Sequence, residues 1–316
     1  MENSSTDLLE LSSLPKENWW GDEYLYKVGD FWLLPEFVQS TYRLIKQYKP
    51  LPSDIILASF PKTGTTWLKT LLFSITHQSS KDRLAKENPH DLVPVLELQV
   101  YGLSNDQPLV TTPANNVSPR IFSTHTPYQL LAETLDSSEC RVVYVTRNPK
   151  DTLISMWHFV NKWEDRAKKG LWPLEVAADK FCNGLTPCGP YYDHVMEYKK
   201  LSLERPEKLF FITYEELKSD PKTHVKKLAE FLGCPFEGED VEEQVEEVVK
   251  SCSFEVLSNH EINKSRSLEQ FNLPYNSFFR KGAVGDHKNH LSDEAIERID
   301  ALTREKFHST GFIYGI

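Results

Sequence analysis

The chain is most informative in the run Asp54-Ile55-Ile56-Leu57-Ala58-Ser59-Phe60-Pro61-Lys62-Thr63-Gly64-Thr65-Thr66-Trp67-Leu68-Lys69. An apolar run of strand length enters a tight turn with one glycine, and an apolar run of helical length follows. Free N–H groups at a helix N-terminus, with a lysine and several hydroxyls beside them, suit a phosphate. The order is not that of a Walker A loop, because Lys62 precedes Gly64 instead of following it. The alternative is a plain strand-to-helix turn, which does not need a lysine and three threonines around one glycine.

Apolar runs of strand length recur along the chain, at 54–60, 120–124, 141–146 and 208–213. Longer segments with helical spacing separate them. This alternation predicts an α/β fold with a central parallel sheet flanked by helices. Because no repeat and no Pro/Ser/Gly-rich linker divides the chain, we expect residues 1–316 to form a single domain.

Helix signals support this division of the chain. Asn148-Pro149 and Asp220-Pro221 each place a capping side chain before a proline, and Gly233 ends the helix that follows the second pair. A last helix is expected from about Ser292 to Phe307. The acidic run 237–247 is interpreted as a solvated helix face.

Two further basic clusters are candidates for binding an anion. Arg147 directly follows a predicted strand, at the rim where open α/β sheets bind ligands, and Ser155 lies on the next predicted helix. Arg280-Lys281-Gly282 lies in an irregular segment, 258–285, which is too long for an ordinary connection. Each cluster taken alone has a plainer interpretation: a surface ion pair for Arg147 and a solvated loop for Arg280.

One of the ten histidines has a context that suggests catalysis. His125 directly follows the predicted strand 120–124 and should face the same rim as both predicted phosphate sites, where a histidine can act as a general base. The other histidines are interpreted as surface or structural residues. No H-E-x-x-H pattern or Cys/His metal spacing occurs, so we expect no metal site.

Composition excludes several classes of protein. The net charge of −10 makes nonspecific nucleic-acid binding improbable. Apolar runs are too short for a spanning helix, and the polar start 1–7 is not a signal peptide, so we expect no membrane association. Five cysteines without a C-x-x-C pair suggest free thiols. These features predict a cytoplasmic protein.

As an ordered set, the three motifs resemble the cytosolic sulfotransferases, which transfer sulfuryl groups from 3′-phosphoadenosine-5′-phosphosulfate (PAPS) to small molecules. The resemblance runs from about Asp54 to the C-terminal helix, and the stretches 88–94, 181–184 and 278–282 resemble the plant branch. It implies a P-loop-NTPase-like fold with a modified phosphosulfate-binding loop. It also implies PAPS as co-substrate without a metal, and a monomer or weak homodimer.

The resemblance assigns roles to particular residues. The loop that holds the 5′-phosphosulfate would contain Lys62, Thr63, Gly64, Thr65, Thr66 and Trp67. The 3′-phosphate would be held by Arg147, Ser155, Arg280, Lys281 and Gly282, with residues 258–290 covering the cofactor. Trp67 and Phe254 would sandwich the adenine, and Tyr214 would contact its edge.

The implied reaction is an in-line displacement. Lys62 would stabilise the oxygen that bridges to the leaving phosphate, and His125, with a pKa near neutral, would take the acceptor's proton. Ser155 could restrain Lys62 until an acceptor arrives. Two rival functions are a non-catalytic binder of adenosine 3′,5′-bisphosphate and a small-molecule kinase. Retention of both catalytic residues argues against the first, and the missing Walker A order argues against the second.

The acceptor is expected to be a small hydroxylated molecule, such as a flavonoid, steroid, hydroxy acid or desulfo-glucosinolate. Residues 1–50 form an N-terminal arm whose aromatic residues either line an apolar acceptor pocket or pack on the core. The candidate pocket residues are Trp19, Trp20, Tyr24, Tyr26, Phe31, Trp32, Tyr101, Phe159 and Trp163.

Three positions depart from the family pattern. Thr63 replaces a usual Ser, and His287 replaces a Trp after Gly285-Asp286, which puts the packing beneath the 3′-phosphate loop in question. Ser123 stands where the animal enzymes have a Lys, and its spacing from His125 predicts that both face the reacting centre. The family's dimer segment is poorly reproduced around 288–297, so the oligomeric state is left open.

Overall fold

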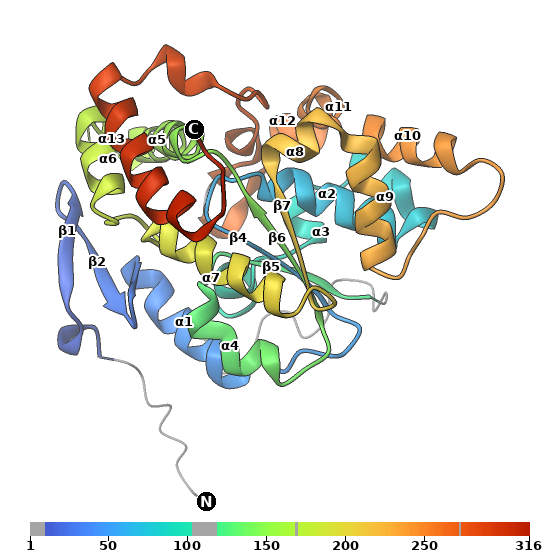
Figure 1. Ribbon diagram of the computed structural model, residues 1–316, viewed down its shortest axis with the longest axis horizontal. Coiled ribbons are helices and arrows are strands. Elements are labelled where there is room, and N and C mark those ends of the chain that lie inside the picture. The colour runs from blue at the N-terminus through green and yellow to red at the C-terminus, as the bar shows by residue number, and fades with distance from the viewer. Residues whose placement is uncertain (1–9, 103–118, 168–169, 272) are drawn as a thin grey trace, which may run out of the picture.

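The computed structural model describes residues 10–102, 119–167, 170–271 and 273–316, and their side chains except those of 81, 163–167 and 270 (Figure 1). Its centre is a sheet of four parallel strands in the order β5-β4-β6-β7. The strands are β4 (Ile55–Ser59), β5 (Ile121–Thr124), β6 (Arg141–Thr146) and β7 (Leu209–Thr213). All four predicted strands and the predicted α/β architecture are therefore confirmed.

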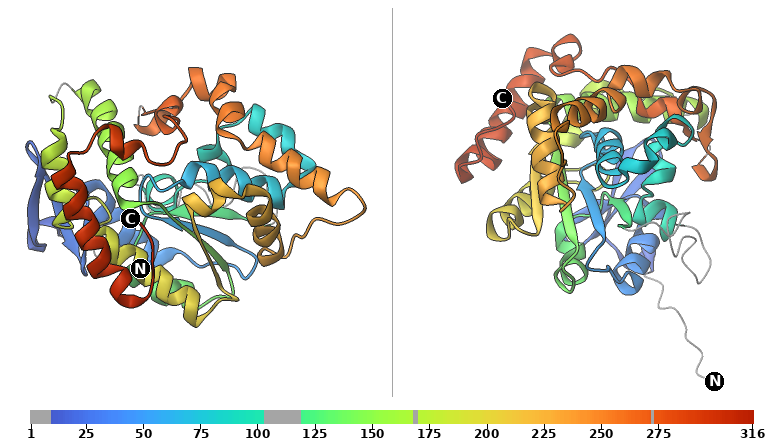
Figure 2. Two further views of the ribbon diagram at one scale, coloured as in Figure 1. Left: turned by 45° about the horizontal axis from the view of Figure 1, so that its top comes forward. Right: turned by 90° about the vertical axis from the view of Figure 1, so that its right-hand side faces the viewer.

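The two faces of the sheet are covered by different helices, because successive side chains of β4 point to opposite faces. Ile56 and Ala58 belong to one buried cluster and Ile55 and Leu57 to another. The first face is covered by α1 (Pro35–Gln47), α4 (Tyr128–Asp136) and α7 (Tyr191–Glu204). The second is covered by α2 (Thr65–Thr76), α9 (Pro221–Phe231) and α10 (Val241–Ser251). Figures 1 and 2 show helices on both sides of the sheet.

The remaining helices surround this core. They are α3 (Pro89–Leu92), α5 (Pro149–Ala167), α6 (Leu174–Cys182), α8 (Tyr214–Ser219), α11 (Phe254–Asn259), α12 (Glu261–Ser265) and α13 (Asp293–Lys306). The predicted caps are present: Asn148 Oδ1 accepts a hydrogen bond from Lys150 N–H, and Asp220 and Ser292 cap α9 and α13. Helix α10 is acidic on its exposed side, but Val245 and Val248 are buried against the core. None of the helices in the described ranges is both long and apolar enough to cross a membrane.

The N-terminal region is more regular than the predicted arm. It forms a three-stranded antiparallel sheet of β1 (Lys16–Trp20), β2 (Glu23–Val28) and β3 (Phe31–Leu33), followed by α1. Gly21 and Gly29 adopt positive φ values of 55° and 59° in the two turns, each before an aspartate. Turns of this type join antiparallel strands, so the Gly-Asp pairs were an available signal for hairpins.

The predicted irregular segment 258–285 also contains short elements. It holds α12 and a two-stranded pair, β8 (Ser267–Leu268) with β9 (Leu273–Pro274). Leu268, Leu273 and Tyr275 form a small hydrophobic cluster of their own, separate from the two faces of the sheet. Elements of two to five residues have no periodic hydrophobic pattern, so they could not be predicted from the sequence.

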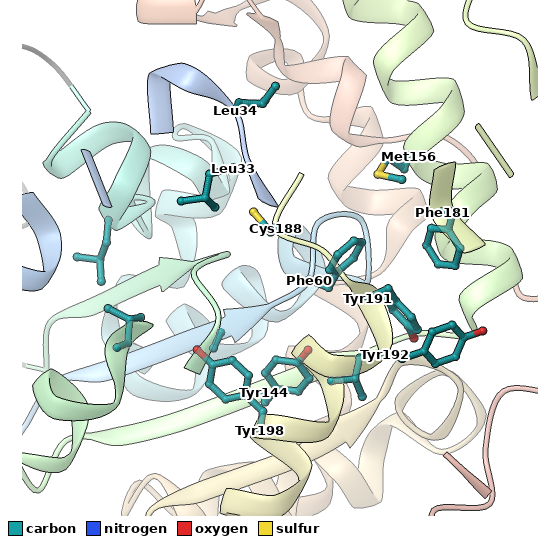
Figure 3. Packing of buried hydrophobic residues seen from close by; sticks show 14 of the residues in the cluster. Leu33, Leu34, Phe60, Tyr144, Met156, Phe181, Cys188, Tyr191, Tyr192 and Tyr198 are labelled. Atoms are coloured by element: carbon teal, nitrogen blue, oxygen red, sulfur yellow. The ribbon is translucent and has the colours of Figure 1, made fainter. Parts of the chain in front are cut away.

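Aromatic residues pack behind the end of β4 (Figure 3). The Phe60 ring lies edge-on to Tyr191, with ring centroids 5.1 Å apart, and Tyr144 stacks on Tyr198 at 4.4 Å. Phe60 and Tyr144 are fully buried. This packing fixes the base from which the loop after β4 projects.

Candidate active site

A predicted site residue follows each strand of the central sheet. Lys62 follows β4, His125 follows β5, Arg147 follows β6, and Tyr214 follows β7. The carboxyl ends of parallel strands lie at one edge of a sheet, where open α/β folds bind ligands. Since β5 and β6 pair with opposite sides of β4, these residues converge from both directions.

A cavity of about 1210 Å³ opens at this edge. Its lining includes every predicted site residue except Thr63: Lys62, Gly64, Thr65, Thr66, Trp67, His125, Arg147, Ser155, Tyr214, Phe254, Arg280, Lys281 and Gly282. The Thr63 side chain is buried and donates hydrogen bonds to the carbonyl oxygens of Phe60 and Val145. The Thr63 hydroxyl therefore anchors the loop to the sheet and is not available to a ligand.

The loop after β4 adopts a conformation that suits an anion site. Lys62 has a φ of 71° and Gly64 a φ of 118°. A Cβ on Gly64 would lie 2.8 Å from the ring of Tyr214, so this position requires glycine for both space and backbone angle. The loop leads into the N-terminus of α2 at Thr65, where free N–H groups point outward.

Lys62 is surrounded by aromatic rings and positive charge. Its Nζ lies 3.8 Å from the ring centroid of Phe159 and 5.6 Å from that of Phe278. Burial, followed by the charges of Arg147, Arg280 and Lys162, lowers the pKa of Lys62 to about 7. An anionic ligand would reverse the charge effect. Ser155 lines the same cavity, but Phe159 makes the contact with the Lys62 Nζ.

His125 is held by hydrogen bonds on three sides. Its N–H donates to Glu97 at 2.6 Å, and its carbonyl oxygen lies 3.1 Å from His194 Nε2. Its ring Nδ1 lies 2.8 Å from the Ser59 carbonyl oxygen. A carbonyl can only accept, so Nδ1 carries the proton and Nε2 keeps a lone pair available for accepting one.

The pKa of His125 differs from the expected near-neutral value. Burial, with the charges of Lys69 and Lys62, outweighs the Ser59 hydrogen bond and lowers this pKa to about 4. The imidazole is therefore neutral at pH 7, the form that a general base requires, although it is a weaker base than predicted.

Ser123 does not line the cavity that His125 lines, contrary to the prediction that both residues face the same centre. It is fully buried, its N–H donates to the Pro94 carbonyl at 2.9 Å, and it forms a bridge with Val95. The period-two rule failed because His125 lies beyond the last residue of β5, where the chain leaves the strand.

Arg147 joins the cavity to the segment around His287. Its guanidinium lies 4.7 Å from the Tyr214 ring centroid, donates to the Ala283 carbonyl at 2.6 Å and lies 3.6 Å from an Asp151 oxygen. Asp151 also accepts hydrogen bonds from the N–H groups of Gly285 and His287, and the His287 Nδ1 lies 2.8 Å from its Oδ1. Burial alone would raise the pKa of Asp151, but the bonds from His287 and Gly285 hold it at about 2.

His287 thus has a structural role of its own in place of the usual tryptophan. It is 7% exposed, and its ring and N–H both bind Asp151. Arg280 and Lys281 pair with the neighbouring Asp286. The two basic residues of the third motif, Arg280 and Lys281, therefore lie near the residues that bind Arg147 and line the same cavity.

The three predicted adenine contacts line the cavity together. Trp67 and Tyr214 pack edge to face with centroids 5.5 Å apart. A Cβ on Gly282 would lie 2.7 Å from the Phe254 ring, so Gly282 lets the third motif approach that ring closely. The Trp67 Nε1 is buried without a hydrogen-bond partner.

The predicted acceptor aromatics are mostly elsewhere. Trp19 and Phe159 line the cavity, but the other described candidates do not: Trp20, Tyr24, Tyr26, Phe31, Trp32 and Tyr101. Trp20, Tyr26, Trp32 and Tyr101 belong to or pack against the buried cluster on one face of the central sheet, and Tyr101 contacts Tyr48 with ring centroids 6.4 Å apart. Phe31 packs against His194, and Tyr24 is exposed. The side chain of Trp163 lies outside the described residues. Four lining residues from the same region were not predicted: Glu23, Leu34, Glu36 and Phe37.

Several buried polar residues at the site were also missed. Lys69 and His90 form a buried pair on α2 and α3, and Glu97 binds both the His125 N–H and the Thr124 hydroxyl. Glu97 is a lone acidic residue in an apolar run, 92–98, which is a signal that the sequence contained. Lys69 had no such signal, because a lysine on a helix is ordinarily solvated.

His158, Asp286 and His290 lie close enough to share a metal ion, with ligand atoms within 4.8 Å of one another. Arg280 and Lys281 both pair with Asp286, and their charges oppose a cation there. The absence of a metal from the reaction stays a prediction.

A parallel sheet with an anion-type loop after its first strand, and a lysine and a histidine at its rim, is typical of α/β proteins that bind a nucleotide phosphate. Residues 52–311 match the Sulfotransferase domain. The chain belongs to the sulfotransferase family, and the predicted PAPS-dependent activity is confirmed at the level of that family.

Plant proteins are prominent among its relatives. Cytosolic sulfotransferase 5 of Arabidopsis thaliana is 41% identical, with 98% of this chain and 96% of that protein covered. Flavonol 3-sulfotransferase of Flaveria bidentis is also 41% identical, with 92% and 93% covered. These relatives confirm the plant branch, and the name of the first agrees with the predicted cytoplasmic location.

Solved structures agree with the fold. A candidate steroid sulphotransferase of Arabidopsis thaliana matches with a TM-score of 0.73 and 35% identity, covering 96% of this chain and 93% of that one. A retinol dehydratase crystallised with androsterone and inactive cofactor PAP matches with a TM-score of 0.71 at 18% identity, covering 94% and 91%. At that identity the second likeness supports the fold alone.

Proposed function

We propose that the chain transfers the sulfuryl group of PAPS to a hydroxyl of a small-molecule acceptor, with Lys62 and His125 as its catalytic residues. The observation that carries the proposal is the state of His125 at the cavity rim. Its Nδ1 is committed to the Ser59 carbonyl, so its Nε2 lone pair is left for an acceptor proton. Lys62 lines the same cavity, and the two residues follow neighbouring strands.

The cavity offers polar groups that fit an adenosine 3′,5′-bisphosphate unit. The Arg147 Nε and the Trp67 Nε1 are both buried without a hydrogen-bond partner. Arg147, Arg280 and Lys281 gather near the proposed 3′-phosphate position, while the N-terminus of α2 supplies N–H donors at the proposed 5′-position. Trp67 and Phe254 supply apolar faces for the base.

His125 would accept the acceptor's hydroxyl proton on Nε2 while the acceptor oxygen bonds to sulfur. Lys62 and the N–H groups of α2 would stabilise the charge that remains on the bridging oxygen when its bond to sulfur breaks. Glu97 and His194 hold the His125 backbone and so keep its ring at the required position. We propose that residues 258–290 cover the bound cofactor.

The acceptor classes remain those predicted: flavonoids, steroids, hydroxy acids and desulfo-glucosinolates. One relative is named a flavonol 3-sulfotransferase, and a solved structure is described as a candidate steroid sulphotransferase, which supports the first two classes. The acceptor end of the cavity is lined largely by apolar residues, including Phe37, Val95, Leu98 and Phe159. We expect a monomer or weak homodimer.

The alternative function is a non-catalytic binder of adenosine 3′,5′-bisphosphate. Binding alone needs no oriented base, so the arrangement of His125 favours catalysis. The test is to incubate the protein with sulfur-35-labelled PAPS and a panel of plant phenols, steroids, hydroxy acids and glucosinolate precursors. A labelled product that disappears in Lys62→Ala is expected. Tight binding of adenosine 3′,5′-bisphosphate without transfer to any acceptor would favour the alternative.

A further inference from the structure

A buried lysine lies one helical turn beyond the phosphosulfate loop. Lys69 on α2 is fully buried, and its Nζ lies 3.0 Å from the Nδ1 of His90. Removing a charged group from water is expensive, and a methionine of similar length would fill this space at lower cost. Nothing in the proposed mechanism uses Lys69, so its presence calls for an explanation.

His90 connects this lysine to the cavity. It lies on α3, 6% exposed, and its Nε2 is 3.2 Å from the Thr66 Oγ1. The ring stacks on Phe278 with centroids 3.8 Å apart. The backbone N–H of His90 donates to Asn88 Oδ1, and its backbone carbonyl accepts a hydrogen bond from the Gln99 side chain. The ring is therefore fixed between Lys69 and Thr66.

The chemistry of the three groups sets the direction of the hydrogen bonds. A lysine ammonium can only donate, so Nδ1 of His90 must accept and Nε2 must carry the ring proton. Nε2–H then donates to Thr66 Oγ1, which leaves the Thr66 hydroxyl proton free to point elsewhere. Thr66 is the second residue of α2 and lines the cavity, so its proton can be directed at a ligand.

We propose that Lys69 and His90 are positioning residues that orient the Thr66 hydroxyl to donate a hydrogen bond to the phosphosulfate group. The proposal rests on the proposed function, because it takes the loop to be the phosphosulfate site. Without Lys69, His90 can adopt the other tautomer and accept the Thr66 proton. The ligand would then face an oxygen lone pair in place of a donor.

The state of Lys69 sets the conditions for a test. Burial lowers the pKa of Lys69 to about 7, while Glu97 and Asp91 oppose this shift. The ammonium form therefore predominates near pH 6, and the measurement is made at that pH. Desolvation, with the charge of Lys69 next, lowers the pKa of His90 well below its usual value, so His90 is neutral at that pH.

The experiment measures adenosine 3′,5′-bisphosphate binding by calorimetry at pH 6, for the wild type, Lys69→Met, Thr66→Val and the double variant. We expect each single variant to weaken binding about three- to tenfold, and the double variant to be no weaker than Thr66→Val alone. Thr66→Ser, which keeps the hydroxyl, should restore most of the affinity. His90→Phe, which keeps the stacking on Phe278, should resemble Lys69→Met.

Lys208→Met is the matched control, because Lys208 is also buried and donates to the carbonyls of Leu135 and Ser138, away from the cavity. It should bind the bisphosphate as the wild type does. Wild-type affinity in Lys69→Met, or losses that multiply in the double variant, would overturn the proposal. If the wild type transfers sulfuryl groups and Thr66→Val binds the bisphosphate as tightly as the wild type, the proposal is overturned and the proposed function stands. A wild type that neither binds the bisphosphate nor transfers would remove the proposed function itself.

Discussion

The two ends of the cavity, which we propose hold the cofactor and the acceptor, are built in different ways. At the cofactor end, Lys62, His125, Arg147 and Tyr214 each follow a strand of one parallel sheet within a few residues. At the acceptor end, the lining comes from segments far apart in the sequence. These include Trp19 on β1, Phe37 on α1, Phe159 on α5, Cys188 before α7 and Phe278.

This difference has a physical basis. Backbone hydrogen bonds between parallel strands fix where each strand ends, so they fix the starting positions of Lys62, His125, Arg147 and Tyr214. The acceptor end is not built on the ends of hydrogen-bonded parallel strands. Its position depends on packing of the N-terminal sheet, as in the contact of Trp19 with Trp172 at 5.1 Å, and on the pairing of Trp32 with residues 188–189. We expect mutations at the two ends to separate cofactor effects from acceptor effects.

The largest effect is expected for His125→Ala. Without the base, kcat should fall about 10²- to 10⁴-fold with an alcohol acceptor, while binding of adenosine 3′,5′-bisphosphate changes little. Because acidic phenols ionise without help, the loss should shrink as the phenol becomes more acidic. On the acid side of the wild-type pH profile, activity should fall as pH drops toward the His125 pKa of about 4, where the imidazole becomes protonated. Near-wild-type turnover of an alcohol would identify a different base.

Lys62→Ala should lower kcat about 10²- to 10³-fold, with a smaller loss of cofactor affinity, because the charge is needed most as the bridging oxygen becomes anionic. The active form is the ammonium, so wild-type kcat/KM for PAPS should decline as pH rises through about 7. The corresponding decline in kcat should lie at higher pH, since the bound anion favours the charged lysine. Equal losses in affinity and turnover would make Lys62 a binding residue only.

Arg280→Ala should weaken binding of adenosine 3′,5′-bisphosphate by about 10- to 100-fold, since a forked contact to phosphate contributes roughly 1.5–3 kcal/mol. Binding of adenosine 5′-phosphosulfate, which lacks the 3′-phosphate, should hardly change. The matched control is Arg298→Ala, an exposed arginine that pairs with Asp179 on the surface. If Arg280→Ala bound both ligands more weakly by the same factor, Arg280 would not contact the 3′-phosphate.

Phe37→Ala tests the other end of the cavity. Phe37 is half-buried and lines the acceptor end from α1. Its truncation should raise KM for an aromatic acceptor about three- to tenfold, and the affinity for adenosine 3′,5′-bisphosphate should stay within twofold of wild type. Tyr24→Ala serves as the control, because Tyr24 is 41% exposed on β2 and does not line the cavity. A parallel loss of nucleotide affinity in Phe37→Ala would show that the two ends are coupled.

The same contrast explains how much of the molecule could be predicted. The four strands and the caps of α9 and α13 were predictable, because their signals are local: an apolar run or a capping side chain. The resemblance to the sulfotransferases supplied Tyr214 and Phe254. All the predicted cofactor residues except Thr63 line one cavity, and their binding roles stay predictions. The exception is Thr63. The direction of its hydroxyl could not be read from the sequence, because the group donates to the carbonyl of Val145, which is 82 residues away.

The acceptor end could not be predicted to the same degree. Trp19 and Trp20 are adjacent in the sequence, yet β1 directs only Trp19 into the cavity, and nothing local distinguishes them. The Lys69–His90 pair was missed for a related reason. Its partners are 21 residues apart on two helices, and only packing brings them together.

The smallest effect is expected for His287→Trp, which restores the family's usual residue. A side chain that merely filled space would tolerate the larger ring, and the affinity for adenosine 3′,5′-bisphosphate would be unchanged or slightly higher. The structure gives His287 a polar role, because its Nδ1 lies 2.8 Å from Asp151 Oδ1. The Trp ring N–H is placed differently, so Asp151 would lose this partner.

Asp151 would nevertheless keep the N–H groups of Gly285 and residue 287 and its contact with Arg147, so the loss should be partial. We therefore expect nucleotide affinity to fall about two- to fivefold, less than for Arg280→Ala, with acceptor KM unchanged. His287→Asn retains a side-chain donor near Asp151, so its nucleotide affinity should fall less than that of His287→Trp. Tighter nucleotide binding in His287→Trp would show that packing beneath the 3′-phosphate loop contributes more than the hydrogen bond to Asp151. If acceptor KM were unchanged in the same variant, the histidine would lower affinity for the nucleotide alone.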